Sequence, residues 1–309
     1  MGVIAVLGPT ASGKSGLAMA LAAELGGEIV SVDSMQVYRG LDIGTAKASA
    51  EDQAAVPHHL IDVADPEETF TAAEHQRLGI PAIDQIKERG KLPLIVGGSG
   101  LHFRAVVDPL DFPPSDPDVQ SEIQAMTPGD AVLALLAIDP EVARYVDLAN
   151  SRRVSRALEI HRITGVTPTE RSSSAMATAV REYRPRIPLL AIGLDPGDSL
   201  PERVESRFDA MLDNGLLDEV RNLEPRLGVT ARQGVGYKEL LPVVAGEIAI
   251  EEGRAAAIRA SMALAKRQRT FFRRDPRIRW IPWHDESGRM LEEALTTARE
   301  TIQEAAWTS

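Results

Sequence analysis

The chain has 309 residues, 44% of them hydrophobic, and this length can bury one large core or two modest ones. It contains no cysteine, which excludes disulfides, thiolate metal sites and cysteine nucleophiles. No secretory signal precedes the first apolar run, and no run approaches the ~20 apolar residues of a membrane-spanning helix. We therefore expect a cytoplasmic protein with no membrane partner.

Charge is distributed unevenly along the chain. The total is −11, yet the segment from Arg254 to Arg279 holds nine basic residues and one acidic residue, a net charge of +8. An acidic total argues mildly against a nucleic-acid partner, but a local basic segment matters more than the sum.

Short apolar runs alternate with helical patterns in the first hundred residues and again near residue 190. The expected strands are Val3–Leu7, Glu28–Val32, Lys91–Val96 and Leu189–Leu194. Strands that alternate with helices predict an α/β fold, here a parallel sheet flanked by helices like that of P-loop NTPases. Ligands of such sheets bind beyond the carboxyl ends of the strands. The polar residues at or just past those ends are Ser15, Asp33, Ser99 and Asp195.

The sequence pattern changes after residue 108. Prolines cluster there, and the helical patterns that follow are not separated by expected strands. We expect residues 1–110 to form the first part of the P-loop core and residues 111–187 a mostly helical insertion domain. Residues 188–309 return to the core, are largely helical, and include the basic segment 254–279.

A phosphate-binding loop follows the first expected strand. Residues 8–15, GPTASGKS, match G-x-x-x-x-G-K-[ST] at every fixed position, and they lie between a strand and a helix as the motif requires. Glycines let backbone N–H groups turn toward an anion, and the helix N-terminus and the lysine add positive charge. The motif predicts a di- or triphosphate ligand, with Mg²⁺ at the Ser15 hydroxyl. The phosphate-binding residues are Gly8, Pro9, Thr10, Ala11, Ser12, Gly13, Lys14 and Ser15.

Two aspartates after strands can each be interpreted in two ways. Leu190–Asp195 has the form of a Walker-B strand, but Pro196 and Gly197 follow it and no glutamate is adjacent, which favours a plain core strand ending in a turn. Asp33 could cap a helix, or it could face the phosphates across the sheet and serve as a general base.

Several segments closely resemble the tRNA dimethylallyltransferases, also called tRNA isopentenyltransferases. They include the GPTASGKS form of the phosphate loop and the run DSMQVYRG that begins at Asp33. The resemblance runs in order from residue 3 to about residue 283. The other matching segments are Leu41–Lys47, Val56–Asp62, Val96–Gly100, Arg207–Leu212, Gly215–Leu217, Val235–Glu239 and Ala265–Gln268.

The resemblance implies transfer of a dimethylallyl group from dimethylallyl diphosphate to N6 of the adenosine 3′ to the anticodon, adenosine 37 of tRNA. It implies Asp33 as the base, Thr10 and Ser99 as diphosphate ligands, Arg207 as an additional cation, and Mg²⁺ as cofactor. The partner would be the tRNA anticodon stem-loop, bound by a monomer and contacted by the insertion domain, residues 111–187. The implied tRNA-binding residues are Asp33, Ser34, Met35, Gln36, Ser99, Gln120, Arg152, Arg153, Val154, Ser155, Arg156, Lys266 and Arg267. Gln120 stands where the family commonly has an arginine.

The residues alone leave other interpretations open. A P-loop small-molecule kinase would share the loop and an acceptor carboxylate, although no compact arginine-bearing lid is visible near residues 100–130. A non-catalytic nucleotide- or RNA-binding module is a second alternative, but it would not explain why Asp33 and Ser99 both lie beside the phosphate loop. Arg207 could be a solvated helix residue, His58 and His59 structural histidines, and the aromatic residues near 271–283 core.

Overall fold

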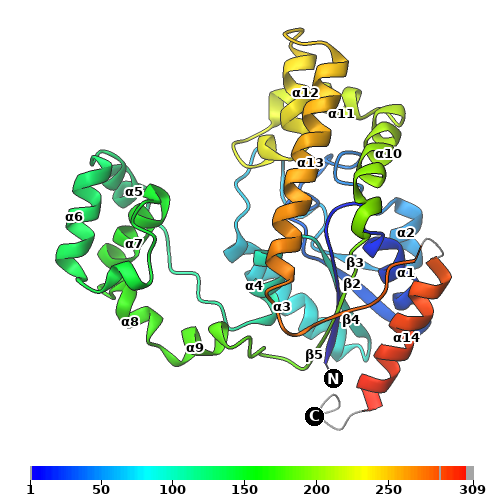
Figure 1. Ribbon diagram of the computed structural model, residues 1–309, viewed down its shortest axis with the longest axis horizontal. Coiled ribbons are helices and arrows are strands. Elements are labelled where there is room, and N and C mark those ends of the chain that lie inside the picture. The colour runs from blue at the N-terminus through cyan, green and yellow to red at the C-terminus, as the bar shows by residue number, and fades with distance from the viewer. Residues whose placement is uncertain (1, 285–286, 304–309) are drawn as a thin grey trace. The chain divides into compact units, whose positions relative to one another are not determined.

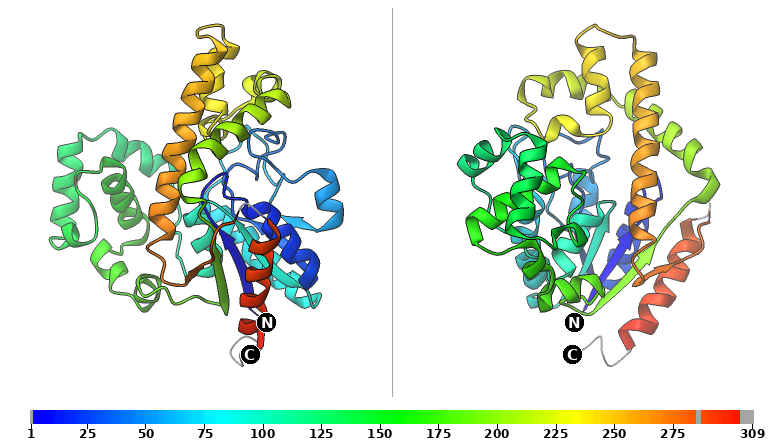
Figure 2. Two further views of the ribbon diagram at one scale, coloured as in Figure 1. Left: turned by 45° about the vertical axis from the view of Figure 1, so that its right-hand side comes forward. Right: turned by 60° about the vertical axis from the view of Figure 1, so that its left-hand side comes forward.

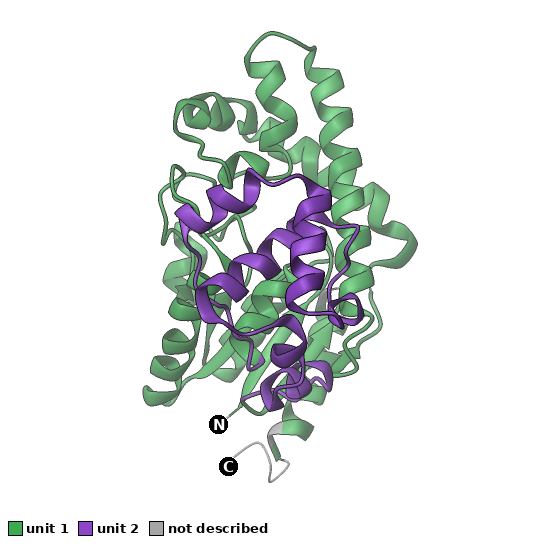
Figure 3. Ribbon diagram, turned by 90° about the vertical axis from the view of Figure 1, so that its left-hand side faces the viewer, with its two compact units in different colours: residues 1–107, 187–309 green, residues 108–186 purple. Residues whose placement is uncertain are grey.

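The computed structural model of the protein describes residues 2–284 and 287–303 (Figure 1). The chain divides into two compact units. The first comprises residues 1–107 and 187–309, and the second comprises residues 108–186 (Figure 3).

The first unit is built on a six-stranded sheet in which every recorded pair of neighbouring strands is parallel. The strand order is β3-β2-β4-β1-β5-β6, so β1 lies between β4 and β5. Because the strands are parallel, their carboxyl ends share one edge of the sheet. The strands are β1 (Val3–Leu7), β2 (Gly27–Ser31), β3 (His58–His59), β4 (Leu92–Gly97), β5 (Leu189–Gly193) and β6 (Ile278–Trp280).

Both faces of the sheet are buried, which explains why the strands read as continuous apolar runs. In β1, Ile4 and Val6 face the cluster that contains residues of helices α1 (Lys14–Leu25) and α14 (Ser287–Gln303). The alternate residues, Val3, Ala5 and Leu7, face helices α3 (Ala72–Glu88) and α4 (Gly100–Val107). Figure 2 shows α1 and α14 side by side against the sheet.

A further helical layer in the first unit packs around the loop that follows β2. Val37, Tyr38 and Leu41 of that loop share a buried cluster with Phe208 and Tyr237. This packing fixes the loop next to the carboxyl edge of the sheet. The helices of the unit not yet named are α2 (Ala50–Ala55), α10 (Leu200–Asp213), α11 (Leu216–Leu223), α12 (Tyr237–Val244) and α13 (Ile250–Phe272), with 3-10 turns at Gly197–Ser199, Glu224–Arg226 and Ala231–Gln233.

Every element described in the second unit is helical, and its own core contains Leu135, Val154 and Leu158. Its helices begin with a side-chain cap followed in three cases by proline, which suits the first helical turn because its missing N–H is not needed there. The helices are α5 (Pro117–Gln124), α6 (Pro128–Ile138), α7 (Ser151–Thr164), α8 (Pro168–Ser172) and α9 (Ala175–Arg181), with a 3-10 turn at Val142–Arg144.

The expected α/β fold is confirmed, and the four expected strands lie within one residue of their expected ends. Strands β3 and β6 were not expected, because two or three residues carry too little periodicity to be recognised. Among the described residues, no helix combines the length and apolarity needed to cross a membrane.

Candidate active site

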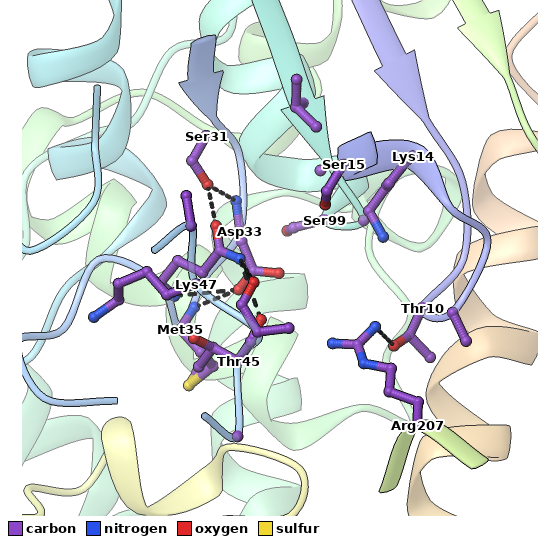
Figure 4. Close-up of a pocket in the computed structure, with 18 of the residues that line it drawn as sticks. Thr10, Lys14, Ser15, Ser31, Asp33, Met35, Thr45, Lys47, Ser99 and Arg207 are labelled. Carbon is purple, nitrogen blue, oxygen red and sulfur yellow. Dashed lines mark hydrogen bonds between the residues drawn. The ribbon is translucent and has the colours of Figure 1, made fainter. Parts of the chain in front are cut away.

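A cavity of about 420 Å³ lies at the carboxyl edge of the sheet. Its walls come from the loops after β1, β2 and β4 and from helices α10 and α13. In Figure 4, Lys14, Ser15, Asp33 and Arg207 extend toward a common space. The volume is typical of a pocket for a small organic ligand.

The phosphate loop is held in a conformation that suits an anion. Ala11 and Gly13 both have positive φ angles, 60° and 83°. Such left-handed residues turn successive N–H groups toward one concave side, which binds phosphates in P-loops. The N-terminus of α1 adds partial positive charge there.

Three side chains bind the carbonyl groups of the same loop. Pro9 O accepts from Lys14 Nζ at 3.1 Å and Ala11 O accepts from Arg203 Nε at 2.8 Å. Ser12 O accepts from Trp283 Nε1 at 3.2 Å, and the guanidinium of Arg203 stacks over the Trp283 ring at 4.8 Å. These contacts fix the loop from segments about 190 and 270 residues away in the chain.

Two cations and a hydroxyl meet beside the loop. Arg207 NH1 donates to Thr10 Oγ1 at 3.0 Å, while Thr10 N donates to Gln268 Oε1 at 2.8 Å. Burial and the positive charge of Arg207 lower the pKa of Lys14 to about 8, against an opposing effect of Asp33. Burial likewise lowers the pKa of Arg207, again opposed by Asp33. Positive charge is therefore concentrated on two largely buried side chains beside the loop.

Asp33 lies two residues past β2 and uses its two carboxylate oxygens differently. Oδ1 accepts from the backbone N–H groups of Met35 at 2.8 Å and Gln36 at 3.3 Å. No hydrogen bond of Oδ2 is recorded among residues 2–284 and 287–303. Asp33 is therefore a turn cap, and its carboxylate also reaches the cavity (Figure 4).

Ser99 lies two residues past β4, in a glycine-rich loop that α13 approaches closely. A Cβ atom on Gly98 would lie 2.4 Å from Gln268 Nε2, and one on Gly100 would lie 2.1 Å from the Phe271 ring. Glycine is therefore required for α13 to reach this loop. The Ser99 hydroxyl pairs with Nδ1 of His102 at 2.6 Å, a contact that the sequence analysis did not anticipate.

Residues 44–48 form one wall of the cavity, and side chains of α11 and α12 hold the start of this segment in place. Glu219 of α11 accepts hydrogen bonds from the backbone N–H groups of Asp42, Ile43 and Gly44. Tyr237 of α12 also donates its hydroxyl to Glu219. The side chain of Lys47 is only 3% exposed, and its ammonium group pairs with Asp42 and Asp62, each at 2.6 Å.

Other residues singled out in the sequence have structural partners. His59 Nε2 pairs with Glu28 at 2.7 Å and His58 Nδ1 with Val56 O, also at 2.7 Å. Asp195 pairs with Arg269 and Arg273 and caps Gly197 N. These partners favour a plain strand end over a Walker-B aspartate. In the described part of the chain, no group of three or more His, Cys, Asp or Glu residues could hold a metal ion.

The cations assigned to tRNA binding fall into exposed and engaged groups. Lys266 and Arg267 of α13, and Arg152 and Arg153 of α7, are exposed and have no recorded partner within residues 2–284 and 287–303. Arg156 instead donates to Pro113 O at 2.6 Å and Pro114 O at 3.2 Å and pairs with Glu159.

The remaining residues assigned to tRNA binding lie at the cavity or within the second unit. Ser34, Met35 and Gln36 line the cavity. Gln120 donates to Glu159, and the Val154 side chain is 1% exposed in the core of the second unit. Ser155 is half-buried on α7. Val154 and Gln120 thus support the helix packing, and their assignment to tRNA stays a prediction.

The aromatic residues near the basic segment also include both buried and exposed side chains. Phe272 is fully buried, whereas Phe271 is 38% and Trp280 is 37% exposed.

Comparisons with known proteins agree with this geometry. Residues 36–275 match the family model described as IPP transferase. The tRNA dimethylallyltransferase of Streptomyces coelicolor is 43% identical over 90% of this chain and 89% of that protein, and the enzyme of Thermobifida fusca is 43% identical over 91% and 90%.

Solved structures give the same result. The tRNA isopentenylpyrophosphate transferase of Bacillus halodurans has 36% identity and a TM-score of 0.69 over 98% of both chains. A eukaryotic dimethylallyltransferase, described as acting on tRNA, has 25% identity and a TM-score of 0.79 over 98% of this chain and 81% of its own. The chain therefore belongs to the IPP transferase family.

Proposed function

We propose that the protein transfers a dimethylallyl group from dimethylallyl diphosphate to N6 of adenosine 37, the adenosine 3′ to the anticodon of tRNA. The observation that carries the proposal is that one cavity holds a carboxylate, Asp33, and a cradle for a diphosphate, Gly8–Ser15. The relatives named tRNA dimethylallyltransferase support the same reaction.

The chemistry needs a base because the exocyclic amine of adenine is a weak nucleophile whose lone pair is delocalised into the ring. N6 attacks the first carbon of the prenyl group and forms a C–N bond. The C–O bond to the diphosphate breaks and its electron pair stays on that oxygen. Asp33 accepts the N6 proton, and its Oδ1 bonds to Met35 and Gln36 hold the carboxylate in place during this transfer.

The leaving diphosphate gains negative charge, which fixed donors must stabilise. Lys14, Arg207 and the amides of the phosphate loop supply this charge stabilisation, with Thr10 and Ser99 as hydroxyl donors. Arg207 holds Thr10 Oγ1 at 3.0 Å, so the Thr10 proton remains free to point at a phosphate oxygen. Ser99 would lie near the oxygen of the breaking bond.

The site also fits Mg²⁺ brought in by the diphosphate. The Ser15 hydroxyl lines the cavity and has no recorded hydrogen-bond partner among the described residues. Since no cluster of three acidic or histidine side chains is described, phosphate oxygens and water would supply most of the ligands, as Mg²⁺ prefers in phosphoryl sites. When bound, the ion neutralises charge that develops on the diphosphate.

The tRNA would contact the exposed cations Lys266 and Arg267 in one unit and Arg152 and Arg153 in the other. Salt-dependent contacts of this kind position a nucleic acid without reading its sequence. We expect the enzyme to work as a monomer in the cytoplasm.

The test is to incubate the protein with unmodified tRNA, dimethylallyl diphosphate and Mg²⁺, digest the tRNA to nucleosides and analyse them by mass spectrometry. The expected product is N6-prenylated adenosine, mapped to position 37 by sequencing the digest fragments. A parallel reaction with ATP in place of the prenyl donor tests the kinase alternative. Absence of prenylated adenosine, with phosphoryl transfer from ATP to a small acceptor, would overturn the proposal.

A further inference from the structure

The side chain of His102 contacts the Ser99 hydroxyl and can influence how Ser99 takes part in the reaction. Ser99 precedes α4, and His102 is the third residue of that helix. Their Oγ and Nδ1 atoms lie 2.6 Å apart. The i, i+3 spacing is that of a capping box, in which a Glu or Gln three residues after the cap reaches back to it. Here an imidazole takes that position and holds the hydroxyl itself.

The direction of this hydrogen bond decides what Ser99 can offer to a ligand. If Nδ1 accepts, the Ser99 proton is used internally and the oxygen presents only lone pairs to the cavity. If Nδ1 carries a proton and donates, the Ser99 proton is free to point into the cavity. A neutral imidazole has one N–H, and either nitrogen can carry it.

The surroundings of His102 keep its ring neutral. Burial lowers the pKa of His102, although the negative charge of Asp33 opposes this effect. The ring of His75, on α3, meets that of His102 edge to face at 4.8 Å and is fully buried. Burial and the neighbouring His102 lower the pKa of His75 to about 3. Asp33 acts on His102 through its charge and His75 through the ring contact, and no hydrogen bond joins His102 to either group among the described residues.

An anionic ligand selects between the two directions. Lone pairs of Ser99 would repel a diphosphate oxygen, whereas a hydroxyl proton would bind it. We propose that His102 is a positioning residue, which donates its Nδ1 proton to Ser99 Oγ when the diphosphate is bound and so aims the Ser99 hydroxyl at the oxygen of the breaking C–O bond. The inference rests on the proposed prenyl transfer. No proton leaves His102 or Ser99, and the N6 proton still passes to Asp33.

The test compares single-turnover prenyl transfer in four variants, each shown to fold by thermal unfolding. His102→Phe should slow transfer roughly three- to tenfold, the size of one hydrogen bond, with an unchanged Michaelis constant for tRNA. His102→Asn keeps an N–H near the Nδ1 position and should restore at least half of the wild-type rate. In the Ser99→Ala background, His102→Phe should slow transfer no further, because its target is gone.

A matched control is Asp130→Ala in α6, which removes the same i, i+3 arrangement with Thr127 at residues that do not line the cavity. Its rate should stay within about twofold of wild type, since a cap loss acts on stability.

Three outcomes would each overturn the inference. They are equal slowing by His102→Phe in the wild-type and Ser99→Ala backgrounds, equal rates for His102→Phe and His102→Asn, and a fully active Ser99→Ala variant. A wild-type protein that makes no prenylated tRNA would instead overturn the proposed function.

Discussion

The walls of the cavity and the exposed cations of α7 and α13 both concentrate positive charge, but they hold it differently. In the cavity, Lys14 and Arg207 each donate to a fixed oxygen, and burial lowers the pKa of each. Lys266 and Arg267 are exposed, with no recorded partner in the described chain. We therefore expect that substitution of a single cavity residue will affect the reaction strongly, whereas each exposed cation will contribute only a small share of tRNA binding.

The largest expected effect comes from the carboxylate of the cavity. Asp33→Asn keeps the shape and the oxygen that caps Met35 and Gln36, but it removes the proton acceptor. We expect tRNA and diphosphate binding near wild type and a loss of ~10²–10⁴-fold in the rate of transfer. The measurement is single-turnover transfer with filter binding of tRNA. A rate within about threefold of wild type would show that Asp33 is not the base.

The lowered pKa of Lys14 gives diphosphate binding in the cavity a pH dependence. Below pH 8 the free protein already carries the Lys14 charge, so diphosphate affinity should be flat. Above pH 8 binding must take up a proton, so affinity should fall by up to about tenfold per pH unit. Lys14→Arg stays charged and should remove the dependence.

Calorimetric titration with magnesium diphosphate between pH 7 and 9.5 tests this expectation. The ratio of wild-type to Lys14→Arg affinity cancels the titration of the ligand itself. A ratio that stays constant across this range would contradict a pKa near 8 for Lys14.

An intermediate effect, on stability alone, is expected where α13 is anchored to the sheet. Asp195 is 13% exposed in its side chain and holds both Arg269 and Arg273. Asp195→Ala leaves these arginines unpaired and should lower the free energy of unfolding by about 1–3 kcal/mol. Denaturant unfolding measures the loss. The Mg²⁺ concentration for half-maximal activity should not change, whereas removal of a true Walker-B aspartate would raise that concentration strongly.

The smallest effects belong to the exposed cations. Lys266→Ala and Arg267→Ala should weaken tRNA binding and each reduce the slope of log affinity against log salt by roughly 0.7–0.9. The Michaelis constant for the prenyl donor should not move. Arg254→Ala is the matched control, because that guanidinium already pairs with Asp209 and Glu205. A wild-type slope for both Lys266→Ala and Arg267→Ala would show that these cations only solubilise the helix.

The same contrast can be tested in the second unit. Arg152→Ala and Arg153→Ala should reduce the salt slope in the same way. Arg156→Ala should chiefly lower the melting temperature, because Arg156 binds the carbonyls of Pro113 and Pro114. A change of slope for Arg156→Ala as large as for Arg152→Ala would remove the distinction.

Local patterns predicted the parts of the molecule that depend on neighbours in the chain. The four longer strands and the phosphate loop were identified because period, glycines and turn chemistry all act within about ten residues. The carboxylate of Asp33 could not be assigned to one role, and the structure explains why: one oxygen caps the turn while the residue lines the cavity.

Contacts between distant segments could not be read from local patterns. The residues alone favoured a solvated helix position for Arg207, yet it reaches Thr10 across 197 residues. The approach of Arg203 and Trp283 to the phosphate loop, and the pairing of His102 with Ser99, depend on how the helices pack after the sheet forms. Basic residues of α13 likewise looked equivalent until their partners were known.

The hydrogen bond from Trp283 to Ser12 O joins residues 271 positions apart, and Gln268 binds Thr10 from 258 positions away. A ribosome adding ~5–20 residues per second takes roughly 13–54 s to cover either distance. Throughout that interval the nascent chain displays the phosphate loop without the groups that fix it. We therefore expect a translation intermediate arrested before residue 268 to bind diphosphate poorly, so that the proposed donor site is completed only after Gln268 and Trp283 have been synthesised.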